Sequence, residues 1–284
     1  MIQKQTLDGL PGILEISDPL EVRDYPFPDF MIIGPQRTGT TWLCECLRRH
    51  PAIFMSSPKE LYFFSHLKLQ DHPLYASSDL NWYVKHFADT EEEFTRKNKI
   101  MQELYGESYR PQVRGEATAS YAAMEEEAIR LIYALNPDVK IIMMVRNPVD
   151  RAWSHAKKDL ARDLKRPWQE VPREEFERFF TNRYQLRCGY FSKIIRRWSG
   201  VIKKKNLLIQ HFEAIEKKPV KLLKTVCGFL GVKRSAKYFK HELVNRKINI
   251  TEGTHMPPYY RNFLEELFSG EIKELEQRYK ITFE

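Results

Sequence analysis

Residues 30–41 read FMIIGPQRTGTT. The first four form an uninterrupted apolar run, which is typical of a buried strand. A glycine-bearing loop follows, and a helix pattern then runs from Thr41 to His50, where Pro51 ends it. A loop in this context presents backbone N–H groups to a phosphate, and the dipole of the helix start attracts its negative charge. The stretch therefore predicts an anion-binding loop at the carboxyl end of a buried strand.

The rest of the chain alternates strand and helix patterns. The strand expected over residues 139–146 is apolar except for Lys140 and Arg146, which is typical of a central strand covered on both faces. Further strands are expected over residues 113–118 and 206–211. Helix patterns cover residues 124–135, 148–165, 174–180, 185–198, 220–230 and 259–279. This order predicts an α/β fold of P-loop-like, three-layer type, with a central, mostly parallel sheet flanked by helices. Since no shift in composition marks a boundary, we expect a single domain over residues 1–284.

Composition limits the possible functions without selecting one. The chain has 284 residues, of which 42% are hydrophobic and 30% charged, and its net charge of +8 favours anionic ligands. No apolar run approaches the roughly 20 residues of a membrane helix, and the first residues do not resemble a secretory signal. No cluster of histidines or carboxylates indicates a metal site. The chain has only four cysteines, which are Cys44, Cys46, Cys188 and Cys227. We expect them to be reduced thiols, and this favours a cytoplasmic location.

The first loop departs from the Walker A pattern, G-x-x-x-x-G-K-[ST], at one informative position. Gly34 and Gly39 match the glycine spacing, but Thr40 replaces the lysine that serves the outer phosphates of a nucleoside triphosphate. Arg37 adds a fixed positive charge, and the threonines add hydroxyl donors. The loop therefore suits a smaller terminal anion without a metal. The alternative is a plain strand–turn–helix connection with a helix cap.

A second anion site is expected at residues 146–154, which read RNPVDRAWS. Arg146 ends the apolar strand, and Ser154 lies about two turns into the next helix, so the two can hold a phosphate by charge-assisted hydrogen bonds. Asp150 and Arg151 are expected to form a local ion pair or to take part in binding. Two sites at neighbouring strand ends suit a ligand with two separated anionic groups, such as adenosine 3′,5′-bisphosphate, better than a triphosphate.

Together these segments resemble the nucleotide motifs of the sulfotransferase superfamily, with residues 34–43 as its 5′-phosphosulfate loop and residues 146–154 as its 3′-phosphate motif. The resemblance is closest to the heparan-type and bacterial branch, because residues 59–64, KELYFF, match an acidic segment found there after the first loop. Similarity extends through residues 81–83, 115–121, 189–191 and Trp198, and so covers about residues 28–230. It implies a sulfotransferase that uses 3′-phosphoadenosine-5′-phosphosulfate (PAPS), without a metal, to sulfate an acceptor hydroxyl or amine.

The resemblance also implies roles for individual nucleotide-binding residues. Arg37 would contact the 5′-phosphosulfate and steady the leaving phosphate, although many heparan-type relatives carry lysine there and arginine is a poor proton donor. Arg146 and Ser154 would hold the 3′-phosphate. Segment 231–284 would cover the nucleotide, and its basic loop, for which an ordinary exposed loop is the alternative, contains Arg246 and Lys247. The rest of the first loop comprises Thr38, Gly39, Thr40, Thr41 and Trp42.

Sulfo transfer needs a base at the acceptor, positive charge on the leaving side, and positioning. Glu60 is the expected base, with a surface carboxylate as the alternative. Because cytosolic aryl and steroid relatives use histidine, His66 and, less so, His50 are other choices. The acceptor is expected to be a glycan or an aliphatic alcohol. Its expected contacts are Phe63, Tyr83, Glu116 and Lys158. Core packing is the alternative for the two aromatic residues and a structural role for Glu116, whereas Lys158 stands where some relatives have a histidine near the sulfo group.

Two other classes of function remain open at this point. A phosphotransferase with a degenerate P-loop would need magnesium and a triphosphate, and Thr40 argues against it. A non-enzymatic module for anions or nucleic acid is motivated by the positive charge alone. For the sulfotransferase interpretation the acceptor is the expected partner, with neither nucleic acid nor a membrane span involved.

Overall fold

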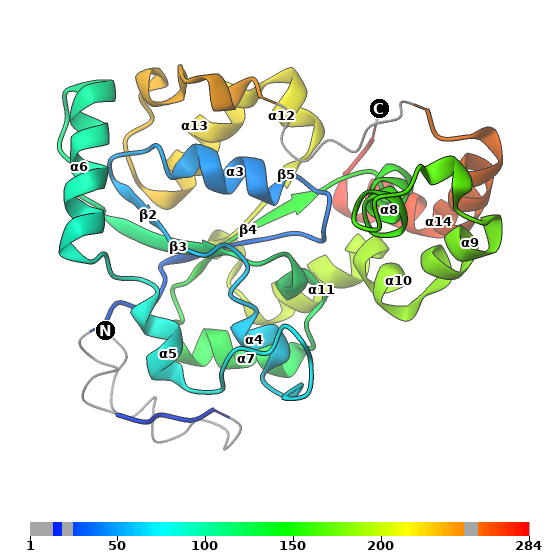
Figure 1. The fold of residues 1–284 in the computed structure, drawn as a ribbon, viewed down its shortest axis with the longest axis horizontal. Coiled ribbons are helices and arrows are strands. Elements are labelled where there is room, and N and C mark those ends of the chain that lie inside the picture. Colours follow the sequence, from blue (N-terminus) through cyan, green and yellow to red (C-terminus); the bar gives the residue numbers. More distant parts are fainter. Residues whose placement is uncertain (1–13, 19–24, 247–254, 284) are drawn as a thin grey trace.

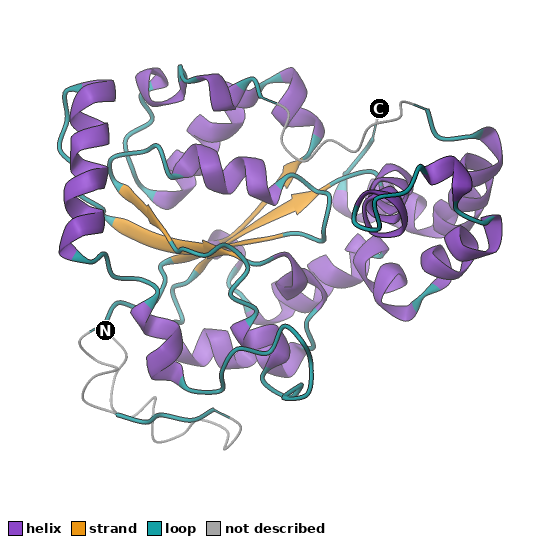
Figure 2. Ribbon diagram, in the orientation of Figure 1, coloured by secondary structure: helices purple, strands orange, loops and turns teal. Residues whose placement is uncertain are grey.

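The computed structural model describes residues 14–18, 25–246 and 255–283. Its centre is a five-stranded sheet in the order β2-β3-β1-β4-β5, in which every neighbouring pair is parallel. Helices cover both of its faces, so the α/β fold with a central parallel sheet is confirmed (Figure 2). The strands are β1 (Phe30–Ile33), β2 (Ile53–Met55), β3 (Val113–Ala117), β4 (Lys140–Val145) and β5 (Leu207–His211).

The alternation of side chains along the central strands explains why both faces are covered. On β1, Phe30 and Ile32 belong to one hydrophobic cluster, whereas Met31 and Ile33 belong to another. Side chains of β4 divide between the same two clusters. Since successive side chains of a strand point to opposite faces, each face of the sheet is apolar and needs its own helix layer.

The helices form three main groups around the sheet (Figure 1). One face is covered by α3 (Thr40–Leu47), α12 (Glu213–Lys217) and α13 (Pro219–Leu230), and the other by α4 (Phe63–His66), α5 (Leu80–Lys85), α7 (Glu126–Leu135) and α11 (Phe191–Val201). Beyond the carboxyl ends of the strands lies a helical lobe of α8 (Pro148–Lys157), α9 (Arg173–Thr181), α10 (Arg183–Gly189) and α14 (Pro258–Tyr279). Helix α6 (Glu91–Tyr105) flanks the β2 edge. The shorter elements are the 3-10 helices η1 (Ala119–Ala123), η3 (Trp168–Glu170), η4 (Lys204–Asn206), η5 (Ala236–Phe239) and η6 (Glu242–Val244).

The structure departs from the sequence-based expectations at several elements. The helix expected over residues 185–198 is two helices, α10 and α11, because the chain turns at Tyr190. The helix expected over residues 148–165 ends at Lys157 and continues as a π-helical turn, η2 (Lys158–Arg162). The sequence patterns do not predict β2, α4, α5 or α6.

The register of the sheet brings the two predicted anion sites to one edge. Ile33, at the end of β1, pairs with Met143 of β4, and Arg146 follows three residues later. The loops that leave these neighbouring strands therefore meet at the carboxyl edge. This is the edge where open parallel sheets bind their ligands.

Candidate functional site

The loop after β1 turns sharply before α3 begins. Arg37 and Gly39 have positive φ angles of 77° and 87°, and the Thr38 hydroxyl donates to the Pro35 carbonyl over 2.8 Å. Glycine suits position 39 because a φ of 87° lies in the left-handed region, and a Cβ there would also stand 2.3 Å from the end of the Ile215 side chain on α12. Helix geometry leaves the first-turn N–H groups, at residues 40–42, without intrahelical acceptors. The loop thus offers backbone donors to an anion.

Three side chains tie this loop to the one after β4. Arg37 Nε donates to Ser154 Oγ over 2.8 Å, and Arg146 Nη1 donates to the Arg37 carbonyl oxygen over 3.0 Å. The Arg146 guanidinium also lies over the Phe212 ring, 4.2 Å from its centroid, which helps to fix its orientation. The structure therefore places Arg37, Arg146 and Ser154 together at the ends of β1 and β4.

Positive charge accumulates at this partly desolvated place. Burial, assisted by the nearby Arg162 and Arg146, lowers the pKa of Arg37 to about 10. Burial is also the main cause that lowers the pKa of Arg146 and of Lys157. The charges of Arg37 and Arg146 lower the pKa of Lys157 further. Cations that repel one another in this way are stabilised by a multiply charged anion. The donors present are guanidinium, ammonium, hydroxyl and backbone N–H groups, which fit phosphate and sulfate oxygens.

Glu60 is held in an uncommon backbone conformation beside the end of β3. Its φ is 65°, its N–H donates to the Ala117 carbonyl over 3.0 Å, and its Oε2 accepts from the Ala119 N–H over 2.8 Å. Its Oε1 forms an ion pair with Lys59, and its side chain is 22% exposed. The carboxylate is therefore oriented by the backbone and still accessible from outside.

A second carboxyl group, that of Glu116, is fully buried near Glu60. It accepts hydrogen bonds from the Tyr83 hydroxyl and from the Thr118 hydroxyl, the latter over 2.7 Å. Burial raises the pKa of Glu116 from 4.5 to about 7 against the opposing effect of these hydrogen bonds, and Glu60 adds to the rise. Thr118 Oγ1 also accepts from the Leu61 N–H over 3.1 Å. Glu116 is thus linked through Thr118 to the segment that carries Glu60.

The other residues expected at the acceptor lie in enclosed or paired surroundings. Phe63 and Tyr83 are 1% and 0% exposed, and their rings stack with centroids 4.6 Å apart, which is the core packing stated as their alternative. Lys158 Nζ lies 2.9 Å from Asp159 and 2.6 Å from Asp163 in ion pairs along η2. Contact of these side chains, or of Glu116, with an acceptor stays a prediction.

The two alternative histidines differ in how they are engaged. His50 is buried, with Nε2 2.9 Å from the Lys233 carbonyl and Nδ1 accepting from the Ala52 N–H over 3.1 Å. His66 Nδ1 lies 3.2 Å from the Tyr62 carbonyl oxygen. Burial lowers the pKa of both rings. Because both ring nitrogens of His50 have backbone partners, we infer that this side chain has a structural role.

The C-terminal segment contacts the first helix of the site through Trp42. Its Nε1 donates to the Val244 carbonyl over 3.3 Å, which joins α3 to η6. Arg246 is exposed, two residues further along. Lys247 lies outside the described residues. Coverage of a nucleotide by segment 231–284 stays a prediction.

The expectation of an ion pair between Asp150 and Arg151 is wrong. The Arg151 guanidinium is fully buried, 3.3 Å from Gln185 Oε1 and 3.3 Å from His155 Nδ1. The Asp150 carboxylate instead faces Arg261 at 4.0 Å. Adjacent residues of a helix point about 100° apart and do not face each other, so α8 separates the two side chains.

Two further residues, Lys157 and Phe212, lie near the anion site and are not among the residues predicted from the sequence. Lys157 lies three positions after Ser154 and therefore on the same side of α8, a spacing that could have indicated it. Phe212 directly follows β5, the next strand to end at this edge. Its contact with Arg146 depends on strand order, which the sequence does not state.

Comparison with known proteins agrees with this geometry. A family model described as "Sulfotransferase family" matches residues 28–236. The chain belongs to the sulfotransferase family. The mouse bifunctional heparan sulfate N-deacetylase/N-sulfotransferase 1 is 30% identical over 222 residues, which are 75% of this chain and 23% of that protein. The membrane-associated sulfotransferase kil1 of Dictyostelium discoideum is 31% identical over 136 residues, which are 48% of this chain and 24% of that protein.

The similarity also extends from the sequence to the fold. The crystal structure of a sulfotransferase from Alicyclobacillus acidocaldarius matches with a TM-score of 0.59 and 27% identity, covering 88% of this chain and 95% of that one. By contrast, the chain spans only about a quarter of the length of the curated relatives named above. Within the described ranges, no helix of this sulfotransferase combines the length and the apolar character of a membrane span, and no three His, Cys, Asp or Glu side chains are grouped to hold a metal ion.

Proposed function

We propose that this sulfotransferase moves the sulfo group of PAPS to a hydroxyl or amine of its acceptor by in-line displacement. The observation that carries the proposal is the pair of hydrogen bonds from Arg37 to Ser154 and from Arg146 to Arg37, which unites donors from two neighbouring strand ends. Because the first turn of α3 and the end of β4 both contribute donors, the site suits a ligand with more than one phosphate-type group. Adenosine 3′,5′-bisphosphate, which PAPS leaves after transfer, has that charge pattern.

Each residue of the site has a separate task in this proposal. Bound PAPS supplies an activated sulfo group on a phosphate leaving group. The first-turn N–H groups of α3 bind the 5′ end, where Arg37 stabilises the negative charge that develops on the leaving oxygen. Arg146 and Ser154 bind the 3′-phosphate. Glu60 takes the proton of the acceptor hydroxyl or amine as it attacks.

We also propose a glycan or an aliphatic alcohol as the acceptor. A relative named as a heparan sulfate N-deacetylase/N-sulfotransferase, whose matching region covers 75% of this chain, supports the glycan. The aliphatic alcohol is supported only by the resemblance of residues 59–64. A cytoplasmic location is a separate proposal, supported by four cysteines that are all buried and unpaired. Incubation with radiolabelled donor and a panel of sugars and alcohols tests the first proposal, and cell fractionation tests the second.

Titration calorimetry with adenosine 3′,5′-bisphosphate, and separately with ATP and magnesium, tests the donor. We expect the bisphosphate to bind without a metal and ATP to bind more weakly. Arg146→Ala should weaken bisphosphate binding by about tenfold or more, because it removes a charge-assisted contact of about 1.5–3 kcal/mol. Arg130→Ala removes an exposed guanidinium paired with Glu126 and should bind like the wild type. Tight, magnesium-dependent ATP binding would instead favour a phosphotransferase.

A further inference from the structure

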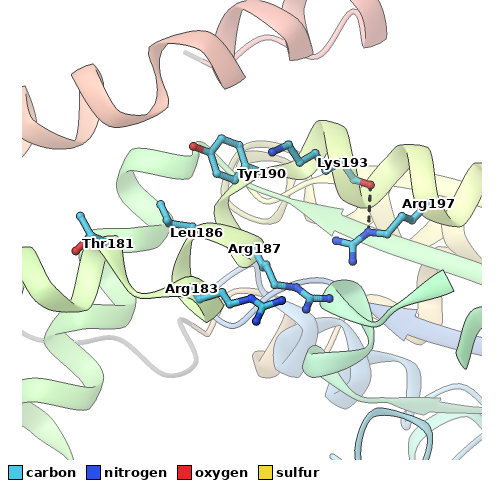
Figure 3. A pocket seen from close by; sticks show the side chains of 7 residues that line it. All are labelled: Thr181, Arg183, Leu186, Arg187, Tyr190, Lys193 and Arg197. Atoms are coloured by element: carbon cyan, nitrogen blue, oxygen red, sulfur yellow. Dashed lines mark hydrogen bonds between the residues drawn. The ribbon is translucent and has the colours of Figure 1, made fainter. Parts of the chain in front are cut away.

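A basic pocket lies between α10 and α11, outside the proposed nucleotide site. Its volume is about 320 Å³, and four of the side chains that line it are cationic (Figure 3). Arg183 and Arg187 come from α10, and Lys193 and Arg197 come from α11. Within each helix the two cations are four residues apart, so they occupy one face. Tyr190, at the turn between the helices, adds an aromatic wall.

The positive charge of this pocket is only partly balanced by the protein. Arg187 Nη1 lies 2.7 Å from Glu125 Oε1, and Arg197 Nη1 lies 3.8 Å from Glu125 Oε2. In the described parts of the chain, neither Arg183 nor Lys193 is in an ion pair; the Lys193 ammonium lies 4.4 Å from the centroid of the Tyr190 ring. Like charges four apart on a helix destabilise it by a few tenths of a kcal/mol. The pocket therefore holds a charge excess that an anion would neutralise.

Two contacts link α10, which supplies part of the lining of this pocket, to the proposed reaction site. Gln36, in the loop after β1, donates through Nε2 to the hydroxyl of Tyr184, which neighbours Arg183 on α10, over 2.7 Å. Arg187 donates to the Ala123 carbonyl at the end of η1, while the first N–H of η1, that of Ala119, donates to Glu60. Since a 3-10 helix rises about 2 Å per residue, η1 spans about 8 Å between these two contacts. A neighbouring unit of an oligomeric acceptor could bridge that distance.

We propose that the basic pocket of Arg183, Arg187, Lys193 and Arg197 binds a carboxylate or sulfate on the unit of the acceptor next to the one that is sulfated. Guanidinium groups suit this task, because their forked N–H donors match two oxygens of a planar or tetrahedral anion. The pocket would thereby select anionic over neutral acceptors. The inference rests on the proposed sulfotransferase function and adds a charge requirement to its acceptor.

Binding to a defined saccharide tests this inference without a need for turnover. The probe is an oligosaccharide of alternating glucuronic acid and N-acetylglucosamine, compared with the same chain after its carboxyl groups are reduced to alcohols. We expect the wild type to bind the anionic probe at least about tenfold more tightly than the neutral one, and the preference to weaken as salt rises. Both measurements are made in the presence of adenosine 3′,5′-bisphosphate.

A double variant, Arg183→Ala with Lys193→Ala, should reduce affinity for the anionic probe by about tenfold or more and leave bisphosphate affinity unchanged. Both side chains are exposed, and thermal unfolding checks that the fold is kept. The control variant, Lys204→Ala with Lys205→Ala, removes the same charge from an exposed stretch outside the pocket and should bind the probe like the wild type.

Three results would count against these ideas, and they are distinguishable. If the double variant and the control bind the anionic probe equally, the pocket is not its site. If the wild type binds the neutral and anionic probes alike while still binding the bisphosphate, the charge requirement is refuted but the proposed function stands. If the wild type does not bind the bisphosphate, the proposed function itself is overturned.

Discussion

Glu60 illustrates how a local backbone conformation prepares a carboxylate. Positive φ is uncommon outside glycine and costs about 1–3 kcal/mol, yet Glu60 and Tyr62 both adopt it, at 65° and 58°. Hydrogen bonds from the N–H groups of Glu60 and Leu61 to the end of β3 offset this strain. The conformation fixes one carboxylate oxygen on the Ala119 N–H and leaves the side chain partly exposed. Strain of this kind at an accessible carboxylate supports its proposed role as the base.

Glu60→Gln should lower turnover by roughly a hundredfold or more, because an amide cannot take the acceptor proton. Bisphosphate affinity should stay at the wild-type value, since the carboxylate is assigned to the acceptor side. Steady-state rates with an acceptor from the panel, together with calorimetry, measure both quantities. Glu127→Gln, which changes an exposed carboxylate paired with Lys68, is the matched control. Wild-type turnover in the Glu60 variant would remove Glu60 from the base role.

Glu116 should make the stability of the protein fall as pH rises. Because burial raises its pKa from 4.5 to about 7, the folded protein keeps this proton over a range in which the unfolded chain has lost it. The stabilisation is complete below about pH 4.5 and is lost as pH rises through about 7. The corresponding decrease in the free energy of unfolding is on the order of 3 kcal/mol.

Glu116→Gln, which keeps the shape of the side chain without an ionisable group, should remove that decrease. Urea unfolding of both proteins at about pH 5 and about pH 8 measures it. The difference between the two proteins is the useful quantity, because buried groups such as His155, whose pKa burial lowers to about 3, give the opposite slope. Parallel pH profiles for wild type and variant would contradict a protonated Glu116.

At the scale of elements, the parts that carry the site were predictable because their signals are local. Strand β1, its loop and α3 are contiguous, as are β4 and α8, so periodicity and glycine spacing describe each of them. Strand β2 has three residues and α4 has four, too few for a periodic pattern. The separation of Asp150 from Arg151 could have been derived from the helix expected over residues 148–165, because adjacent helix residues point about 100° apart. The contact between Gln36 and Tyr184 could not, because it depends on how α10 packs against the loop after β1.

Helix α6 is a different case, because its start signal is present in the sequence. Thr90 Oγ1 accepts from the Glu93 N–H over 3.2 Å, and Glu93 Oε2 accepts from the Thr90 N–H over 3.0 Å, which is a capping box. The apolar pattern that normally reveals a helix is weak here, since only Met101 is buried. A helix at the edge of a sheet can therefore rely on its cap more than on its core face.

Thr90→Ala should lower the free energy of unfolding by about 1 kcal/mol, because the Glu93 N–H loses its acceptor. Urea denaturation measures the change. Thr95→Ala makes the same substitution at an exposed position inside the same helix, where alanine is the better helix former, and should leave stability equal or slightly higher. Equal losses in the two variants would show that the cap contributes nothing specific.

At the scale of the whole molecule, the site depends on how the helical lobe is attached to the sheet. Ser154 belongs to α8 in the lobe, whereas Arg37 belongs to the loop after β1, so their hydrogen bond crosses from one part to the other. Helix α14 packs on α8, where the Trp153 and Tyr260 rings stack 5.2 Å apart. Interactions that fix α14 therefore also help to fix α8, and with it the position of Ser154.

Glu271 of α14 provides such a connection to α11, on the sheet side. Its buried carboxylate accepts from the N–H and from the hydroxyl of Ser192, each over 2.7 Å. Glu271→Ala leaves both donors unpaired in a buried place, so the free energy of unfolding should fall by about 2–4 kcal/mol, seen as a lower urea midpoint with an unchanged slope. Glu274→Ala, on the same helix, removes only an exposed pair with Arg278 at 3.7 Å and should change stability by less than about 0.5 kcal/mol. Similar midpoints for the two variants would mean that the lobe is held by its apolar contacts alone.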